Sequence, residues 1–454
     1  MEFIDRNNEM EALSSSYERG NAEFITITGR KRIGKTELIK RLIDKYGGVL
    51  LTCREESEKL MLQRFSSILG SYFADDFILK NYINSWESFF EYIYRNTLNR
   101  RLIIAIDEFP YAVNNKSLLS ILQDYWDNKL NETKIFLILS GSNISMMENL
   151  SDYKSPLYGR RTGQIELKQF PFIEVLRYIK DPELAVRYYS VFGGTPAYIM
   201  EINKTKSFIE NIKNTFLKLD SFINQDVLFL LREELNEPRY YFSIIEAISS
   251  GKTSLGEIMN YAGLQRNLIS KYLSVLIDLD FIRREIPITS RKSKKGIYLL
   301  KDNMFNFYFR FIYKNYNLIE LNNTEMLINI IKEDMNNYIG HTFEYISIQF
   351  LLELNKKNST FDEIGKWWYK ENEIDIVTLG NKNNEITFYE CKWKVLDEHD
   401  VNSIIKELKE KTKNFKWHEN RIEKYGIIAK KIKNKAKLNG NYTLLDLDDF
   451  EKSI

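Results

Sequence analysis

The stretch that most constrains this chain is "FITITGRKRIGKTELIKRLIDKY", residues 24–46. A run rich in β-branched residues is followed by a glycine-containing turn and then by apolar residues at helical spacing, so the stretch predicts a strand, a loop and a helix. The loop, Gly29 to Thr36, fits the pattern G-x-x-x-x-G-K-T. Backbone N–H groups of such a loop point at phosphate oxygens, and the following helix N-terminus adds partial positive charge. The stretch therefore predicts a nucleotide-phosphate site in an α/β fold with a parallel sheet.

We expect every residue of this loop to contribute to the nucleotide site. Lys35 should reach the β and γ phosphates, and the Thr36 hydroxyl should bind Mg²⁺. A glycine turn before a helix, without any ligand, is the alternative, but the strand before it and the helix after it favour a phosphate loop. The predicted cofactor-binding residues of the loop are Gly29, Arg30, Lys31, Arg32, Ile33, Gly34, Lys35 and Thr36.

A second motif, "RLIIAIDEFPYA", supports the nucleotide site. Leu102 to Ile106 form a continuous apolar run, which is typical of a buried parallel strand, and the run ends in Asp107 and Glu108. Asp107 is expected to hold Mg²⁺ through water, and Glu108 is expected to orient or deprotonate the water that attacks the γ-phosphate. Two acidic residues at a strand end can also cap a helix. The phosphate loop upstream favours the catalytic interpretation.

The next predicted strand, within "KIFLILSGSNISMM", is apolar from Ile135 to Leu139 and then becomes polar. Ser142 is our candidate sensor of the γ-phosphate at that strand end. Serine and asparagine also make ordinary turns, so both interpretations stay open.

Residues 1 to 235 resemble the AAA-like ATPases of the archaeal ATPase group, relatives of the signalling STAND NTPases. The resemblance rests on "FIDRNNEMEAL", the phosphate loop, "IDEFPY", "LSGSNISMM", "SPLYGRRTG" and "FGGTPAYI". It implies an ATPase that uses ATP and Mg²⁺ and has a helical lid that meets the nucleotide near Pro196. It also implies a homo-oligomer in which an arginine reaches the neighbour's γ-phosphate. Arg160 and Arg161 both fit that role, and a surface salt bridge is the alternative for either.

Residues 239–300 predict three helices followed by a β-hairpin, the pattern of a winged helix. Basic residues gather in the predicted wing, and polar residues line the exposed side of the third helix, so we expect contact with DNA. Packing of this region on the ATPase as an extension of the lid is the alternative. The polar residues of the third helix are Gln265, Arg266, Asn267, Ser270 and Lys271, and the core side of the same helix carries Leu268, Leu273 and Leu276. The basic residues of the wing are Arg283, Arg284, Arg291, Lys292, Lys294 and Lys295.

The stretch "EIDIVTLGNKNNEITFYECKW", residues 373–393, predicts a second hairpin. Its strands are Ile374–Leu379 and Glu385–Trp393, and a turn centred between residues 382 and 383 makes paired residue numbers sum to 765. Asp375 then stands opposite Glu390, with Lys392 on the same face. Directly paired carboxylates repel each other unless a cation comes between them. The hairpin therefore predicts a divalent cation, although the charges of a solvated face are the alternative.

Glu344 lies upstream on a predicted helix that is apolar nearly all round. A helical glutamate, an aspartate at the start of a hairpin and E-x-K on its second strand resemble the PD-(D/E)xK nuclease fold. They also resemble the domain of uncharacterised function that commonly follows this type of ATPase. The resemblance implies that Glu344, Asp375 and Glu390 bind Mg²⁺ or Mn²⁺ and that Lys392 activates water. Ile374 replaces the proline that often precedes the first acid, and a folded but catalytically idle domain is the alternative.

Composition sets few limits on partners. Lys and Arg number 65 against 63 for Asp and Glu, and this net charge of +2 argues neither for nor against DNA. Cys53 and Cys391 are the only cysteines of the sequence, so no disulfide framework is expected. No apolar run approaches the roughly 18 residues of a membrane span, and the first residues do not resemble a signal peptide. We expect a cytoplasmic protein without a membrane partner.

A chain of 454 residues is expected to form two to four domains. The expected fold is an α/β P-loop NTPase with a helical lid, a winged helix and a C-terminal α/β restriction-endonuclease-like domain. We expect an ATPase that couples its nucleotide state to DNA binding and metal-dependent DNA cleavage, or else a nucleotide-switched DNA-binding regulator, or a protein scaffold that binds no DNA. The expected ranges are 1–170 for the ATPase core, 171–235 for the lid, 236–300 for the winged helix, 301–335 for a helical linker and 336–454 for the nuclease-like domain.

Overall fold

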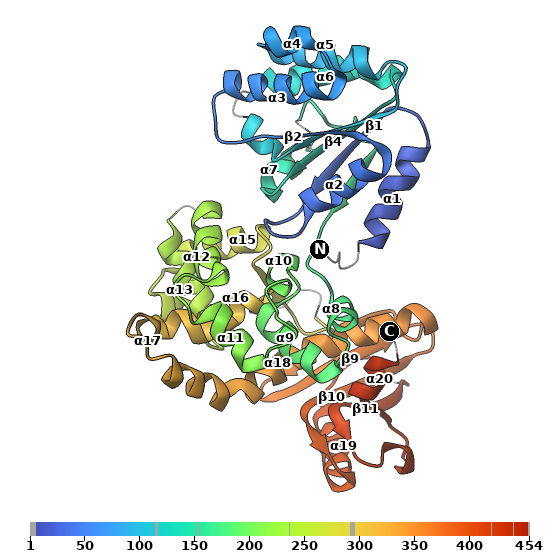
Figure 1. Cartoon of the computed structure of the whole chain (residues 1–454). Helices are drawn as coiled ribbons and strands as arrows, with labels where there is room; N and C mark the ends of the chain where they lie inside the picture. Colours follow the sequence, from blue (N-terminus) through green and yellow to red (C-terminus); the bar gives the residue numbers. More distant parts are fainter. Residues whose placement is uncertain are drawn as a thin grey trace. The chain divides into compact units, whose positions relative to one another are not determined.

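The computed structural model describes residues 6–113, 117–150, 152–153, 155–235, 237–290, 296–418, 420–438 and 440–452. The chain divides into two compact units, Met1–Gln169 and Phe170–Ile454, and each contains a five-stranded sheet (Figure 1). The expected α/β class is confirmed, since the sheet of the first unit is wholly parallel.

The sheet of the first unit has the strand order β2-β3-β4-β1-β5. Residues of β1, β3 and β4 are buried along their whole length, as expected of parallel strands that helices cover on both faces. The carboxyl ends of these three central strands therefore meet at one edge of the sheet. The strands are β1 (Glu23–Thr28), β2 (Gly48–Thr52), β3 (Leu102–Asp107), β4 (Ile135–Gly141) and β5 (Gly163–Glu166).

Helices cover both faces of this sheet, and each face has its own core cluster. Leu38 and Leu42 of α2 pack with Ile25, Ile27 and their neighbours on one face. Phe24 points the other way, as strand alternation requires, and joins the second cluster. The first face carries α1 (Asn7–Glu18) and α2 (Lys35–Tyr46); the second carries α3 (Glu58–Phe73), α4 (Asp76–Lys80), α5 (Trp86–Thr97) and α6 (Ser117–Asn128).

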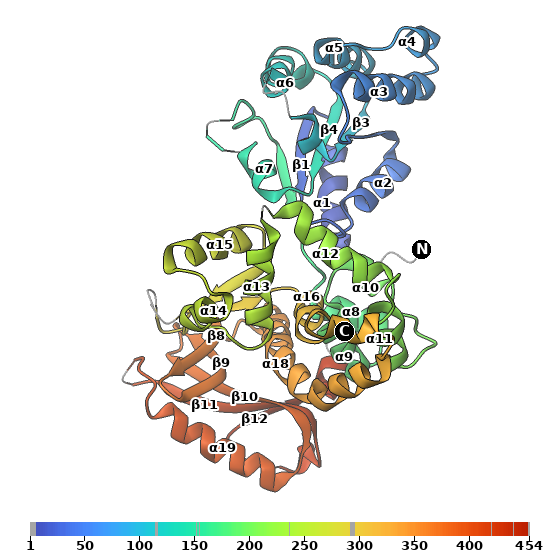
Figure 2. The same ribbon diagram turned by 90° about the vertical axis from the view of Figure 1, so that its left-hand side faces the viewer.

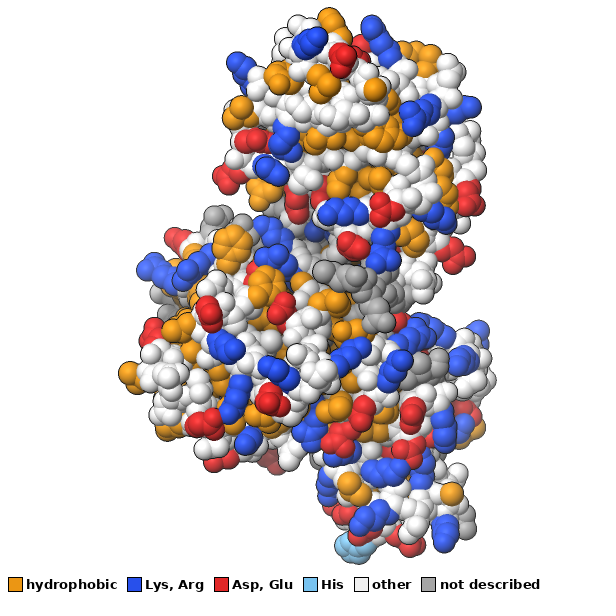
Figure 3. Space-filling model, viewed as in Figure 1, with side chains coloured by type: hydrophobic (Ala, Val, Ile, Leu, Met, Phe, Trp, Pro, Cys, Tyr) orange, Lys and Arg blue, Asp and Glu red, His pale blue; other side chains and the backbone are white. Residues whose placement is uncertain are grey.

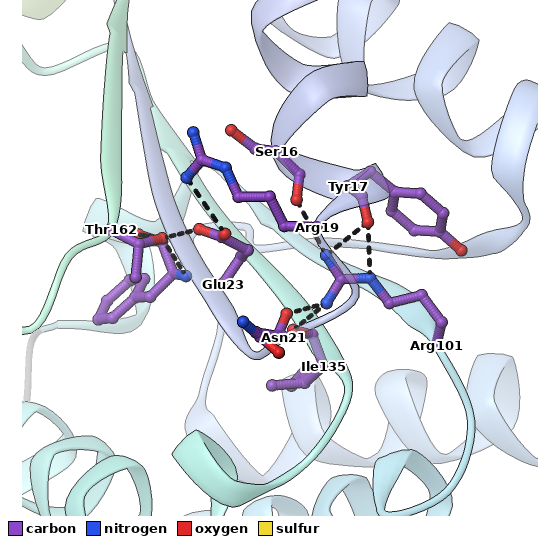
Figure 4. Close-up of polar contacts among 9 residues, drawn as sticks. Ser16, Tyr17, Arg19, Asn21, Glu23, Arg101, Ile135 and Thr162 are labelled. Atoms are coloured by element: carbon purple, nitrogen blue, oxygen red, sulfur yellow. Dashed lines mark hydrogen bonds and ion pairs between the residues drawn. The ribbon is translucent and has the colours of Figure 1, made fainter.

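Arg101 fixes the opposite edge of the same sheet, where the strands begin (Figure 4). Its guanidinium donates to Tyr17 O at 2.9 and 3.1 Å, to Ser16 O at 3.2 Å and to the carbonyl of Asn21. It also reaches Ile135 O at 3.3 Å, so one side chain joins the end of α1, the turn before β1 and the start of β4. Burial lowers the pKa of Arg101, and its partners are backbone carbonyls, so we assign it a structural role.

The second unit begins with helices and then places three helices before a short antiparallel hairpin. In this region α15 has Leu273 and Leu276 buried as expected, but Leu268 is 43% exposed and the expectation that it lies in the core is wrong. The helices are α8 (Phe172–Ile179), α9 (Pro182–Phe192), α10 (Pro196–Ile199), α11 (Phe208–Phe216), α12 (Phe222–Glu234), α13 (Pro238–Ser249), α14 (Leu255–Ala262) and α15 (Arg266–Asp278), and the hairpin strands are β6 (Ile282–Glu285) and β7 (Ile297–Leu300).

A long helix leads into the C-terminal sheet, whose strand order is β12-β11-β10-β9-β8 (Figures 1 and 2). This helix, α18 (Thr324–Asn358), runs unbroken across residue 336, where we expected a domain to begin. The helices before the sheet are α16 (Asn303–Phe307), a π-helical turn (Tyr308–Ile312), α17 (Tyr316–Glu320) and α18; the rest are β8 (Glu363–Tyr369), β9 (Asn372–Gly380), β10 (Glu385–Leu396), α19 (Glu398–Thr412), β11 (Ile422–Ile432), β12 (Thr443–Asp446) and α20 (Leu447–Glu451).

Charged side chains of both signs are interspersed over the face shown in Figure 3. The blue and red side chains alternate on the surfaces of both units, in keeping with the net charge of +2. On this face, charge alone therefore marks no surface of either unit as a site for a polyanion.

Candidate functional sites

The phosphate loop lies between β1 and α2, where the sequence predicts it. Gly29 has φ +148° and Gly34 has φ +94°, backbone conformations that favour glycine. A Cβ atom on Gly29 would also lie 2.5 Å from Leu167 O. Both glycines are therefore required for the course of this loop.

Lys35 lies over the loop that precedes it. Its Nζ donates to Gly29 O at 2.8 Å and to Arg30 O at 3.2 Å, and the residue is only 5% exposed. The ammonium group is thus held at the centre of the loop, where phosphate oxygens would be stronger partners than neutral carbonyls.

Thr36 and Asp107 meet at the carboxyl edge of the sheet. Thr36 Oγ1 donates to Asp107 Oδ2 at 2.6 Å, and the Ser140 hydroxyl donates to Asp107 Oδ1. Hydroxyl and carboxylate oxygens are the ligands that Mg²⁺ prefers, so this pair fits the predicted ion. The sequence did not predict that Ser140 would hold Asp107; the signal was a polar residue at the end of the neighbouring parallel strand.

Glu108 is held beside this pair by Ser142. Glu108 has φ +51°, and its Oε2 accepts from Ser142 Oγ at 2.7 Å and from Ser142 N at 3.2 Å. The predicted catalytic carboxylate and the predicted phosphate sensor are therefore in direct contact. A phosphate that attracts the Ser142 hydroxyl would weaken its hold on Glu108.

Arg6 supports the phosphate loop from the start of the chain. It is 7% exposed and donates to Ile33 O at 3.1 Å and to Lys168 O at 2.7 Å, and it pairs with Glu9 at 2.9 Å. The loop and the segment after β5 are thereby held together. The sequence motif included Arg6, but this positioning role depends on contacts distant in sequence.

The two candidate arginines have different partners. Arg160 forms a bidentate ion pair with Asp127, at 2.8 and 2.7 Å, whereas Arg161 donates to the neutral oxygens of Gln164 at 2.6 Å and Thr26 at 3.3 Å. Both arginines precede β5 and so lie near the edge where parallel strands begin, away from the phosphate loop of their own chain. Neither is therefore placed to serve the phosphate loop of its own chain.

The remaining nucleotide candidate, Pro196, begins α10 of the second unit, and its contact with nucleotide stays a prediction. The polar residues Gln265 to Lys271 named above are exposed on α15. In the wing, Arg283 pairs with Glu285 at 2.7 Å and lies 4.4 Å from the Tyr345 ring centroid, so it faces its own unit. Arg291, Lys292, Lys294 and Lys295 lie outside the described residues.

The C-terminal hairpin has the register that the sequence predicts. Its paired residues run from Glu385–Gly380 to Tyr389–Ile376, and every pair sums to 765. The ladder ends there, because the pairing of β9 with β8 shifts register opposite Asp375 and Ile376. The Asp375 carboxylate accepts from Cys391 N at 2.8 Å. The expected side-by-side pairing of Asp375 with Glu390 is therefore replaced by a bulge.

Glu390 lies on the face of β10 that α19 covers. Glu390 comes two residues after Phe388 and therefore lies on the same face of β10, where Phe388 packs with Leu408 of α19. Lys411 Nζ donates to each carboxylate oxygen of Glu390 at 3.1 Å. Lys392 adds a third contact at 2.8 Å. Two lysines thus neutralise Glu390, whose side chain is only 8% exposed.

Glu344 of α18 is paired in a similar way. Lys366 of β8 donates to Glu344, and both side chains are largely buried. Burial alone would raise the pKa of Glu344, but the hydrogen bonds and charges of His341 and Lys366 lower it. Among the described residues, Asp375 forms no ion pair. Burial and the charges of Glu344 and Glu390 raise its pKa to about 7, against the smaller lowering effects of Cys391 N–H and Lys392.

The three predicted metal ligands are thus not gathered into one cage. Within the part of the chain that the structure describes, no group of three His, Cys, Asp or Glu side chains lies close enough together to hold a metal ion. The physical reason is the bulge at Asp375, which separates its carboxylate from the α19 face where Glu390 meets its lysines. Metal binding by Glu344, Asp375 and Glu390 stays a prediction.

The first unit thus has the parallel sheet, phosphate loop and acidic strand end of a P-loop ATPase. A family model described as an ATPase domain predominantly from Archaea matches residues 3–202, and one described as archaeal and bacterial proteins of unknown function matches residues 308–404. An uncharacterized protein of Methanocaldococcus jannaschii is 37% identical over 462 residues, covering 99% of this chain and 100% of that protein. The chain belongs to this archaeal ATPase family, and the predicted ATPase and the domain of unknown function after it are confirmed.

Solved structures are similar to parts of this chain, and one supports the fold. A Walker-type ATPase of Pyrococcus abyssi has a TM-score of 0.52 at 21% identity, covering 68% of this chain and 96% of that chain. The ORC2 protein of Aeropyrum pernix has a TM-score of 0.49 at 14% identity, covering 71% of this chain and 96% of that chain. Among the described residues, no helix has the length and apolar character needed to cross a membrane.

Proposed function

We propose that this ATPase uses its nucleotide state to control DNA binding and metal-dependent DNA cleavage by its second unit. The observation that carries the ATP-dependent part is the contact between Thr36 and Asp107 at 2.6 Å, with Ser142 on Glu108 beside it. Lys35 and the loop amides bind the phosphates, and Glu108 orients the attacking water and takes up its proton. Thr36 and, through water, Asp107 would hold Mg²⁺, which would neutralise charge on the phosphates.

We assign to Arg161 the role of the arginine that reaches the γ-phosphate of a neighbouring chain. Arg160 would have to leave a bidentate ion pair with Asp127, whereas Arg161 would leave only neutral acceptors. Mixing two inactive variants tests this: Arg161→Ala keeps an intact phosphate loop, and Lys35→Ala keeps an intact arginine. ATPase activity that returns on mixing supports the assignment. The assignment is contradicted if the mixture shows no ATPase activity. It is also contradicted if Arg160→Ala loses ATPase activity while Arg161→Ala keeps it.

The DNA-dependent part is supported by the exposed polar side of α15 and by the nearness of Asp375 to Glu344. The test is incubation of the full chain with plasmid, linear and single-stranded DNA, with Mg²⁺ or Mn²⁺ and with or without ATP. Asp375→Asn keeps the acceptor for Cys391 N and removes the charge, and Glu407→Gln on the exposed side of α19 is the matched control. Cleavage lost only in Asp375→Asn supports a nuclease, and Lys35→Ala reports whether ATP controls it.

A second function is favoured by the lysine contacts of the C-terminal carboxylates. Glu344 is paired with Lys366 and Glu390 with Lys392 and Lys411, so the site is neutralised without any metal ion. The alternative is a nucleotide-switched DNA-binding regulator with an idle C-terminal domain. ATP-dependent DNA binding, with no cleavage in any metal, would favour the regulator.

A further inference from the structure

The second unit contains a pocket of about 540 Å³ that reaches Asp375 and Glu344. Five parts of the chain line it: the end of α13 with the turn after it, the hairpin β6–β7, the helical turns after that hairpin, α18, and the strands β8 and β9. The side chains that matter here are Arg283, Arg310, Glu344, Tyr345, Trp368 and Asp375. Glu344 and Asp375 therefore line a partly open pocket rather than a flat surface.

One wall of the pocket is fixed by contact between the hairpin and the edge strand β8. Ile288 N, in the turn after β6, donates to Lys366 O at 2.9 Å. The Ile288 side chain joins the core cluster of the C-terminal sheet, and a Cβ atom on Gly365 would lie 3.4 Å from Ile288 Cβ. This contact covers backbone groups of an exposed edge and also holds the hairpin in place.

The pocket is too small to enclose a DNA duplex. A sphere of 540 Å³ is about 10 Å across, whereas the major groove of B-DNA alone is about 12 Å wide. With the hairpin docked on β8, a duplex could meet only the mouth of the pocket. A single nucleotide with its phosphate fits the space as it stands.

The lining carries the groups that recognise a single strand. Trp368 is half-buried in the wall, and Tyr345 lies opposite the Arg283 guanidinium at 4.4 Å. Aromatic faces of this kind stack on any base. Arg283 and Arg310 also line the pocket, where each is ion-paired with an acidic side chain of its own unit, Glu285 and Asp334. Trp367 and Tyr369 stack on each other, so they lie on the opposite side of β8 from Trp368.

We propose that this pocket binds one unpaired nucleotide of a single-stranded nucleic acid, with its base against Trp368 and its phosphate beside Asp375 and Glu344, where the divalent cation of the proposed function would have to come between the like charges. The inference rests on the proposed function, because it names the substrate class of the same C-terminal site. It adds that the docked hairpin selects single strands over duplexes.

The test is fluorescence anisotropy of the full chain with labelled single-stranded DNA, single-stranded RNA and blunt duplex DNA, with Mg²⁺ and again with EDTA. Trp368→Ala should weaken single-strand binding by about tenfold or more, the size expected for loss of one stacked base. Trp368→Phe should restore most of the affinity, and duplex binding should not change. Tyr369→Ala, on the adjacent residue and opposite side of β8, is the matched control.

The outcomes separate this inference from the proposed function. Single-strand binding that depends on Trp368 supports the inference even if nothing is cut. A duplex that is bound and cut as well as a single strand, with no effect of Trp368→Ala, overturns the inference and leaves the proposed function standing. Absence of binding to every probe overturns both. A larger effect on RNA than on DNA, or the reverse, supports the pocket and identifies the sugar it accepts.

Discussion

The two candidate sites of this chain hold their carboxylates in different ways. In the first unit, hydroxyl groups hold the carboxylates: Thr36 and Ser140 donate to Asp107, and Ser142 donates to Glu108. In the second unit, ammonium groups do so: Lys366 pairs with Glu344, and Lys411 pairs with Glu390. Neutral donors orient a carboxylate without cancelling its charge, whereas lysines cancel it.

This difference has a consequence for metal binding. A cation that arrives at Asp107 meets a full negative charge whose geometry is already set. A cation that arrives at Glu344 or Glu390 must displace a buried or half-buried ammonium group. The first site is thus ready for Mg²⁺, and the second is closed by its own lysines, with Asp375 as the exception.

The largest effect is expected from Lys35→Ala. Removing the ammonium group that we propose to bind the phosphates should lower ATP turnover by about 10²–10³-fold, as loss of one preorganised charge does at other sites. Turnover is measured as phosphate release at saturating ATP, and Lys40→Ala, exposed on the same helix, is the control. Lys35→Ala turnover within tenfold of the unmodified chain would show that the loop is not the working site.

Removing the charge of Lys366, which pairs with Glu344 in the second unit, should lower the free energy of unfolding. Lys366→Met leaves Glu344 buried without its main partner and should cost about 3 kcal/mol, within the range for breaking a buried ion pair. The double variant Glu344→Gln with Lys366→Met removes the uncompensated charge and should recover most of that loss. Urea unfolding of the three chains measures both values. Equal stability of the single variant and the unmodified chain would mean that the pair is not buried in solution.

The same pair predicts how stability depends on pH. The pKa of Glu344 is lowered in the folded chain, so its contribution is present above its ordinary value of 4.5 and is lost as the pH falls through the folded value. Asp375 has the opposite effect on how stability changes with pH. Its pKa is raised from 3.8 to about 7, so the folded state loses stability as the pH rises between those values.

Asp375→Asn should therefore stabilise the second unit at pH 8, by about 2 kcal/mol, while the gain should vanish toward pH 4. Urea unfolding at pH 4.5 and at pH 8 measures the change. Asp278→Asn, on exposed α15, should give no such gain at either pH. A destabilised Asp375→Asn chain at pH 8 would indicate that the carboxylate is already compensated by a cation in solution.

The phosphate site could be predicted from the sequence because its parts are local. Gly29, Lys35 and Thr36 fall within eight consecutive residues, and the apolar run before Asp107 marks its strand. The hairpin register was predictable for the same reason, since a short turn fixes which residues pair. The bulge at Asp375 was not predictable, because it depends on how β9 pairs with β8, a strand outside the hairpin.

The partners of the C-terminal carboxylates were not predictable from the sequence. Lys366 lies 22 residues from Glu344, and Lys411 lies 21 residues from Glu390, each on an element whose docking angle no local pattern specifies. The choice between Arg160 and Arg161 has the same origin, because Asp127 lies 33 residues before Arg160. Local motifs therefore indicated which residues form the two candidate sites, and only packing revealed how the carboxylates of the second are paired.

The smallest effect concerns the two thiols, one in each unit. Burial raises the pKa of Cys53 to about 12 and that of Cys391 well above its ordinary value, so neither should react with a thiol reagent at pH 8 in the native chain. Each should react once its own unit opens. Mass spectrometry of labelled peptides across a urea series then follows the units separately, and Lys366→Met should shift the midpoint of Cys391 but not that of Cys53. A shift of both midpoints together would show that the two units unfold as one, and that the two sites are coupled through stability.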